Sequence, residues 1–484
     1  MKSRKNTRAP RRERFPTLPK AATGIAGLDE ITGGGLPKGR PTLVCGGPGC
    51  GKTMLAMEFL VRGATEYGEP GVFMSFEETA DDLVQNVASM GFDLAALQSR
   101  KKLYLDQVRV ARSEIHETGE YDLEALFIRL GYAIDSIGAK RVVLDTLEAL
   151  FGGFSNTAVL RAELRRLFDW LKQKKVTAVI TGERGEGQLT RQGLEEYVSD
   201  CVILLDHRVA NQLTIRRLRI VKYRGTIHGT DEYPFLIGAK GISVIPITSL
   251  GLDHRASTEV LSSGVKALDV ALGGGFYAAS TVLASGLAGT GKSTLAAHFI
   301  SAACARGEKS LYVALEQSPD EFLRNTKGVG MPLSKCVSSG LLRFHALRPS
   351  AHGLELHLTS IHQLVEEHAP RIVVVDAITS FMGMGVNAEV TSMIVRLIDH
   401  LKMKNITLYM TSLNEGGETI DCAGANISSV VDTWMLLRNA EHGGERVRTL
   451  SILKSRGMAH SSLTHRFEIT RKGVTLAGAW KPMA

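Results

Sequence analysis

Short apolar runs recur along the chain and alternate with longer amphipathic segments. In the first half these runs are residues 42–47, 71–76, 141–145, 176–181 and 201–206. They are rich in Val, Ile and Leu without regular polar alternation, which is typical of strands buried on both faces of a parallel sheet. Segments 54–68 and 158–175 carry apolar residues at helical spacing. This alternation predicts an α/β fold, a parallel sheet covered by helices.

The second half of the chain repeats the first. Segments 23–40, 46–60, 71–94, 141–151 and 221–225 are answered in the same order by 263–280, 286–300, 310–333, 371–381 and 453–457. A repeat of this length indicates a duplicated domain. We therefore predict a basic disordered tail over 1–18, a first domain over 19–248 and a second over 249–484.

Each repeat contains a phosphate-binding loop. GGPGCGKT (46–53) and GLAGTGKS (286–293) both satisfy GxxxxGK[ST], and each follows an apolar strand and opens an apolar helix. Such a loop binds phosphate through backbone amides and the helix N-terminus, while its lysine reaches the phosphates and its hydroxyl binds Mg²⁺. We therefore expect ATP and Mg²⁺ as ligands. The expected nucleotide-binding residues are Gly49, Cys50, Gly51, Lys52, Thr53, Gly289, Thr290, Gly291, Lys292, Ser293 and Thr294, with Thr53 and Ser293 on the metal.

Acidic residues follow the apolar run after each loop. Glu77 and Glu78 stand there in the first repeat, where a carboxylate can polarise the water that attacks a γ-phosphate. The second repeat has Glu316 and Gln317. An amide cannot act as a general base, so we expect the two halves to differ in chemistry. The alternative is that these acids only favour the start of a helix.

Two further features occur once in each repeat. Asp145 and Asp376 end apolar runs and are candidate Walker B carboxylates for the Mg²⁺ water shell. Late in each repeat stands a basic segment before a glycine. These segments are Lys222, Tyr223 and Arg224, and Lys454, Ser455 and Arg456. They suit a contact in trans with the nucleotide of a neighbouring subunit in a ring, or else a hairpin with solvated charges.

Charge and cysteine content limit the other classes of function. Residues 1–15 hold seven basic side chains and one acidic one, so most of the net charge of +8 belongs to this tail. The rest of the chain is nearly neutral, and we do not expect a nucleic-acid partner. The six cysteines form no CxxC pair, which favours reduced thiols over disulfides or a zinc site. Without a long apolar run or a secretory signal we expect a cytoplasmic protein and no membrane partner.

Taken together, the two phosphate loops, the FEET segment (76–79) and the VKYRG and LKSRG segments resemble the KaiC family of bacterial clock ATPases over residues 20–475. The resemblance implies tandem duplicated RecA-like P-loop NTPase domains in a hexameric double ring, with ATP between subunits. It implies hydrolysis at Glu77 and Glu78 and trans contacts by the two basic segments. It also implies autophosphorylation in the second domain, with Glu316 as the base, also near the metal, and Ser428 and Ser429 as phosphoacceptors.

The sequence departs from the family pattern at several places. Besides Gln317, Val329 replaces a tryptophan that stacks on adenine, and the segment 381–385 lacks an arginine. The chain stops at Ala484 without the long regulatory tail of the family, so we do not expect dependence on a KaiA-type activator. The expected partners are further copies of the chain in a homohexamer and clock or signalling proteins.

Three functions remain open on the sequence alone. The leading one is an ATPase and non-specific serine/threonine autokinase in clock or stress signalling. The others are a RecA-like DNA-dependent ATPase and a scaffold held together by nucleotide. His352, His357 and His362 are spaced by five residues and do not share a helix face, so we interpret them as surface side chains and not as a metal site.

Overall fold

The computed structural model divides into two compact units, Met1–Ser249 and Leu250–Ala484, and each is described here by itself. It describes residues 18–108, 123–146, 148–149, 157–185, 189–190, 199–210, 213–246, 256–351, 353–382, 387–414, 427–442 and 445–480. The basic tail, apart from Leu18, and Cys422 lie outside these ranges.

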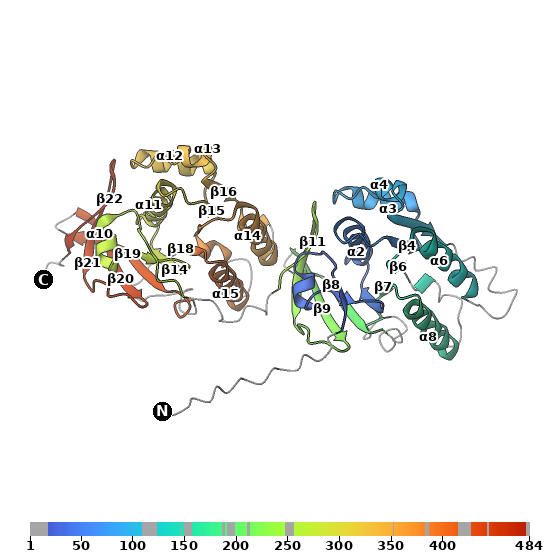
Figure 1. Ribbon diagram of the computed structural model, residues 1–484. Helices are drawn as coiled ribbons and strands as arrows, with labels where there is room; N and C mark the ends of the chain where they lie inside the picture. The colour runs from blue at the N-terminus through green and yellow to red at the C-terminus, as the bar shows by residue number, and fades with distance from the viewer. Residues whose placement is uncertain are drawn as a thin grey trace, which may run out of the picture. The chain divides into compact units, whose positions relative to one another are not determined.

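The first unit is built on a nine-stranded sheet in the order β11-β10-β9-β8-β3-β7-β6-β4-β5 (Figure 1). The strands from β8 to β5 are parallel, and β9, β10 and β11 continue the sheet antiparallel. The strands of the unit are β1 (Lys20–Ala21), β2 (Leu36–Pro37), β3 (Pro41–Gly46), β4 (Gly71–Ser75), β5 (Leu103–Gln107), β6 (Arg141–Asp145), β7 (Thr177–Glu183), β8 (Cys201–Ala210), β9 (Leu213–Tyr223), β10 (Glu232–Gly238) and β11 (Gly241–Val244).

Helices cover both faces of this sheet. They are α1 (Leu28–Ile31), α2 (Lys52–Glu66), α3 (Ala80–Ala88), α4 (Leu94–Ser99), α6 (Glu124–Ile137) and α8 (Thr157–Gln173). Phe73 and Val143 face the core that contains α2, whereas their strand neighbours Met74 and Val142 face the core of α6 and α8. Figure 1 shows α2 and α8 on opposite sides of the strands. Since both faces are buried, the strands carry continuous apolar runs, as predicted.

The second unit repeats this topology, with the sheet order β16-β15-β17-β18-β14-β19-β20-β21-β22 (Figure 1). Its strands are β12 (Val260–Leu261), β13 (Phe276–Tyr277), β14 (Thr281–Gly286), β15 (Ser310–Ala314), β16 (Leu342–Ala346), β17 (Ile372–Asp376), β18 (Thr407–Leu413), β19 (Thr433–His442), β20 (Glu445–Ser455), β21 (Thr464–Thr470) and β22 (Gly473–Ala479). Its α-helices are α10 (Lys266–Leu272), α11 (Lys292–Ala305), α12 (Pro319–Gly328), α13 (Ser334–Ser338), α14 (Leu354–His368) and α15 (Asn387–Met403).

The predicted α/β class, with a duplicated domain and parallel strands covered by helices, is confirmed by the two sheets. In the part of the chain that the structure describes, no helix combines the length and apolarity needed to cross a membrane.

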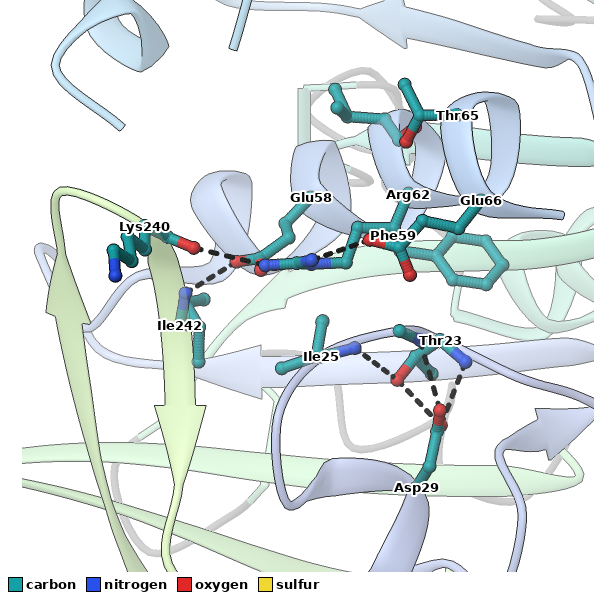
Figure 2. A network of polar contacts seen from close by, with 12 residues as sticks. Thr23, Ile25, Asp29, Glu58, Phe59, Arg62, Thr65, Glu66, Lys240 and Ile242 are labelled. Atoms are coloured by element: carbon teal, nitrogen blue, oxygen red, sulfur yellow. Dashed lines mark hydrogen bonds and ion pairs between the residues drawn. The ribbon is translucent and has the colours of Figure 1, made fainter. Parts of the chain in front are cut away.

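A buried polar network fastens α2, the helix after the first phosphate loop, to strand β11 (Figure 2). The fully buried Glu58 carboxylate accepts hydrogen bonds from the Ile242 amide and from Arg62 Nε, both at 2.6 Å. Arg62 also donates to the Lys240 carbonyl at 3.1 Å. In the second unit His298 of α11 accepts from the Val474 amide of β22 at 2.9 Å. Each loop helix is thus anchored to the last strand of its own sheet.

Candidate nucleotide-binding site

Each phosphate loop ends on a glycine whose backbone other residues rarely adopt. Gly51 and Gly291 have φ of 104° and 105° and directly precede α2 and α11. A Cβ at Gly51 would lie 2.8 Å from Ile237 Cδ1, and one at Gly291 would lie 2.6 Å from Phe467 Cε1. Both the left-handed backbone and the close neighbour therefore require glycine at this turn.

Several loop glycines border open space. A Cβ built on Gly47, Gly49 or Gly289 would meet nothing within 4 Å, so the chain leaves room beside these loop residues. Lys52 Nζ donates to two carbonyls of its own loop at 3.0 Å, and Lys292 Nζ does the same at 2.8 Å. Phosphate oxygens can replace these carbonyls as acceptors, and the α2 and α11 N-termini favour the negative charge.

The Walker B aspartate lies beside the loop hydroxyl in the first unit. Thr53 Oγ1 donates to Asp145 Oδ2 at 2.9 Å, and the Thr181 hydroxyl donates to Asp145 Oδ1. Burial raises the pKa of Asp145, against the effect of these two hydroxyls. A carboxylate and a hydroxyl are oxygen donors that suit Mg²⁺. Thr53 and Asp145 would hold the ion, which when bound neutralises charge on the phosphates.

The two glutamates of the first unit lie at the same edge of the sheet. Glu77 Oε1 accepts from the hydroxyl of Thr146, the residue after Asp145, at 3.1 Å. Glu78 accepts from Asn86 Nδ2 at 3.1 Å. Burial raises the pKa of Glu78, and the nearby Asp145 carboxylate adds to the effect. A carboxylate with a raised pKa is better matched to proton transfer near neutral pH.

The second unit differs at this site. Asp376 accepts from the Thr411 hydroxyl, as Asp145 does from Thr181, but its other oxygen accepts from the Tyr312 hydroxyl. Glu316 accepts from Ser380 Oγ at 2.8 Å. Gln317 takes the place of Glu78 and accepts from Asn325, the counterpart of Asn86, at 3.4 Å. Burial lowers the pKa of Lys292, although Asp376 and Glu316 act to raise it.

Comparison with known proteins identifies the family to which these paired sites belong. The family model described as "ATPase: KaiC" matches twice, over residues 21–249 and 261–479. The chain belongs to the KaiC family. It is 54% identical to "Circadian clock protein KaiC2" of Synechocystis sp. over 96% of this chain and 82% of that protein. It is also 36% identical to "Circadian clock oscillator protein KaiC" of Synechococcus elongatus, over 96% of this chain and 90% of the relative. The predicted resemblance is thereby confirmed, and with it the tandem RecA-like fold.

The basic segment of the first unit lies far from its own phosphate loop. Tyr223 pairs with Cys201, which pairs with Thr42 near the amino end of β3, whereas the loop follows the carboxyl end of β3 at Gly46. Four residue steps along β3 separate Thr42 from Gly46, about 13 Å at the usual rise. The structure therefore does not bring Lys222 or Arg224 to the phosphate loop of its own unit.

The second unit has the same separation, and the two serines predicted as phosphoacceptors lie with the basic segment. Lys454 Nζ donates to the Ser428 carbonyl at 2.7 Å, and Arg456 donates to the Ser429 carbonyl. The Asp432 amide donates to the Thr281 carbonyl at the amino end of β14. Ser428, Ser429, Lys454 and Arg456 thus gather at the edge opposite the loop that follows β14.

One aspartate in each unit forms ion pairs with the basic segment. Neither aspartate was singled out from the sequence. Asp200 lies 3.6 Å from Arg224 and 3.1 Å from Lys172 of α8. Asp432 lies 3.9 Å from Arg456 and 2.7 Å from Lys402 of α15. The signal was available, because an aspartate stands just before or at the start of the apolar run of β8 and β19 in both repeats.

The histidines of α14 and Val329 differ in how their surroundings compare with the sequence-based predictions. His357 is buried, with Nε2 2.9 Å from the Pro349 carbonyl, and His362 packs on His400, so reading them as surface residues was wrong. Helix α14 packs against α15 and the sheet, which buries His357 and half-buries His362; His352 lies outside the described residues. Val329 ends α12 and packs against the core. Among the residues that the structure describes, no cluster of three or more His, Cys, Asp or Glu could hold a metal.

Proposed function

We propose that this KaiC-family ATPase works as a homohexameric ring in which each phosphate loop is completed by the neighbouring copy. The observation that carries the proposal is the separation between the loop edge and the basic edge of each sheet. Arginine and lysine residues that cannot reach their own nucleotide are suited to the nucleotide of the next subunit, as arginine fingers supplied in trans are. A closed ring lets every copy serve one neighbour.

In the first ring the reaction is hydrolysis of ATP. The loop amides, Lys52 and the α2 N-terminus hold the phosphates, with Thr53 and Asp145 at the ion. Glu77 and Glu78 orient and deprotonate the attacking water, and the raised pKa of Glu78 supports this role. Lys222 and Arg224 of the adjoining copy stabilise charge on the leaving group and the transferred phosphoryl.

In the second ring the reaction is autophosphorylation. The hydroxyl oxygen of Ser428 or Ser429 forms a bond to the γ-phosphorus of the nucleotide bound by the next copy. The bond from that phosphorus to the β-γ bridging oxygen breaks, ADP leaves, and Glu316 takes the hydroxyl proton. This proposal is supported by the contacts of Lys454 and Arg456 with the carbonyls of the two serines. The acceptor hydroxyls and the basic groups would therefore reach the nucleotide of the next copy together.

The biological setting proposed is clock or related signalling. The two relatives described above are named as circadian clock proteins, and this chain matches nearly its whole length to them. Other clock or signalling proteins are accordingly the proposed partners, with ATP and Mg²⁺ as cofactors.

The experiment is incubation of the full chain with Mg²⁺ and ATP, followed by mass spectrometry of the peptide spanning 415–435. We expect phosphate on Ser428 or Ser429, and none in the Ser428→Ala/Ser429→Ala double variant. Ser461→Ala, a change in another turn of the same unit, is the matched control. ATP hydrolysis without phosphate in this peptide would contradict the autokinase part. It would favour a second ring that binds nucleotide only for assembly, for which Gln317 is the supporting feature.

A further inference from the structure

The two metal sites differ at one buried aromatic position. Phe73 of β4 pairs with Val143 in the first sheet, and Tyr312 of β15 pairs with Val374 at the same place in the second. Both rings are buried, with exposed fractions of 0% and 1%. At this position the second unit therefore adds one hydroxyl, which lies beside Asp376.

This hydroxyl interrupts a contact that the first site makes directly. In the first unit Thr53 of the phosphate loop donates to Asp145 Oδ2 at 2.9 Å. In the second unit the Tyr312 hydroxyl donates to the corresponding Oδ2 of Asp376. Tyr312 thus occupies the carboxylate oxygen that corresponds to the one bound by the loop threonine in the first unit.

We propose that Tyr312 is a positioning residue that weakens binding of the divalent cation at the second site relative to the first. The proposal rests on the proposed function only in that nucleotide and cation bind at this loop. Each oxygen of Asp376 already accepts a hydroxyl, from Thr411 and from Tyr312. Those hydrogen bonds occupy lone pairs of the Asp376 carboxylate and offset part of its negative charge. Both are then less available to the cation or to its water shell.

Tyr312 differs from the threonine of the first site because its hydroxyl cannot turn away. The Thr53 hydroxyl rotates about χ1 and can leave Asp145 to bind the cation. The Tyr312 ring is fixed by Phe322 and Phe344, with centroids 4.3 Å and 5.5 Å away. Because the fixed ring holds the hydroxyl oxygen beside Asp376, we expect this hydrogen bond to persist when the cation arrives.

The test is a Mn²⁺ titration of the full chain, saturated with a non-hydrolysable ATP analogue and followed by electron paramagnetic resonance. We expect two classes of Mn²⁺ site, of which the weaker is lost in Asp376→Asn. In Tyr312→Phe, which copies the first unit, the weaker class should tighten roughly tenfold, the scale of one hydrogen bond to a charged group. Affinity for the analogue in the presence of a chelator should not change, since no phosphate contact is altered.

Two further variants serve as controls. Tyr409→Phe removes another buried hydroxyl, from strand β18 beside β17, one without a hydrogen-bond partner among the described residues, and should leave both classes unchanged. Phe73→Tyr should weaken the stronger class. Equal affinities in the unaltered chain, or a weaker class that Tyr312→Phe leaves in place, would overturn the proposal. Because the analogue is neither hydrolysed nor used as a phosphate donor, these outcomes are independent of whether Ser428 is phosphorylated.

Discussion

Glu77 and Glu78 lie where β4 ends, next to the Walker B strand of the first unit. Replacing both by glutamine keeps their size and removes the proton acceptors. We expect ATP hydrolysis at the first site to fall by about 10²–10³-fold, the range for loss of a general base, with ATP affinity retained. Phosphate release and equilibrium nucleotide binding measure the two effects.

The matched control for this change is Asp81→Asn, which removes an exposed carboxylate from the first turn of α3 and should leave turnover unaltered. Equal loss of hydrolysis and of ATP affinity in the glutamine variant would contradict a catalytic role and favour a structural one.

At the scale of residues, the sequence predicted groups that recur at fixed spacing. The phosphate loops, Asp145 and Asp376 could be found because their chemistry needs particular residue types beside an apolar strand. Tyr312 could not, since a tyrosine inside a buried strand looks like any core aromatic until its hydroxyl is placed beside Asp376. His362 was misjudged because its burial depends on α15, a helix distant in sequence.

At the scale of elements, the anchor between α2 and β11 rests on Glu58. Glu58→Ala leaves the Ile242 amide and the Arg62 guanidinium without this acceptor. We expect a local loss of about 2–3 kcal/mol, because removing one partner of a buried charged pair exposes the other to its full desolvation cost. Hydrogen–deuterium exchange of β11 peptides should accelerate by roughly 30–150-fold at that energy.

The control is Glu66→Ala, which removes a half-exposed carboxylate from the same Arg62. Pairs of this kind contribute less than about 1 kcal/mol, so β11 exchange should change little. Similar acceleration in both variants would contradict the role given to Glu58.

Helices α14 and α15 meet through two histidines. The rings of His362 and His400 stack with centroids 3.6 Å apart. Burial lowers the pKa of His362 to about 3 and that of His400 to about 4, with Lys404 nearby adding to the effect. Glu366, the nearest acid, is paired with Lys404.

Since the unfolded histidines titrate near pH 6.5, the unfolded chain binds more protons below that pH. The second unit should therefore keep its stability above about pH 6.5 and lose about 2 kcal/mol for each histidine, about 4 kcal/mol together, on going to pH 5. Urea unfolding in a Trp170→Phe background, whose remaining tryptophans lie in the second unit, measures this loss. His362→Phe should reduce the slope, and the exposed His207→Gln should not; a flat profile in the parent would contradict the prediction.

The strands themselves were predictable because burial on both faces leaves an apolar run that is easy to recognise. The antiparallel extension of each sheet, β9 to β11 and β20 to β22, was not predicted. In β9 basic residues interrupt the apolar ones, as in LTIRRLRIVKY, and only pairing with β8 fixes it as part of the sheet.

At the scale of the whole molecule, the trans arrangement predicts interference between subunits. Rings mixed from Lys222→Ala and Lys52→Ala chains contain sites that lack a phosphate lysine, a trans lysine, both or neither. We expect first-ring turnover to vary non-linearly with the mixing ratio, and intact sites to reappear between two singly defective chains. Phosphate release at a series of ratios measures this. Simple averaging of the two parent activities would contradict a shared site.

Strand β14, six residues long, separates the predicted phosphoacceptor serines from the phosphate loop of the same unit. This separation bears on which copy phosphorylates which. On the proposed function, each phosphate on Ser428 or Ser429 comes from the nucleotide bound by an adjoining chain. In a hexamer that contains one chain with an inactive second phosphate loop, a single pair of serines would stay unphosphorylated. That pair would be on the copy that the inactive chain would otherwise phosphorylate. The position of the unphosphorylated pair relative to the inactive chain would show in which direction around the ring phosphate is transferred.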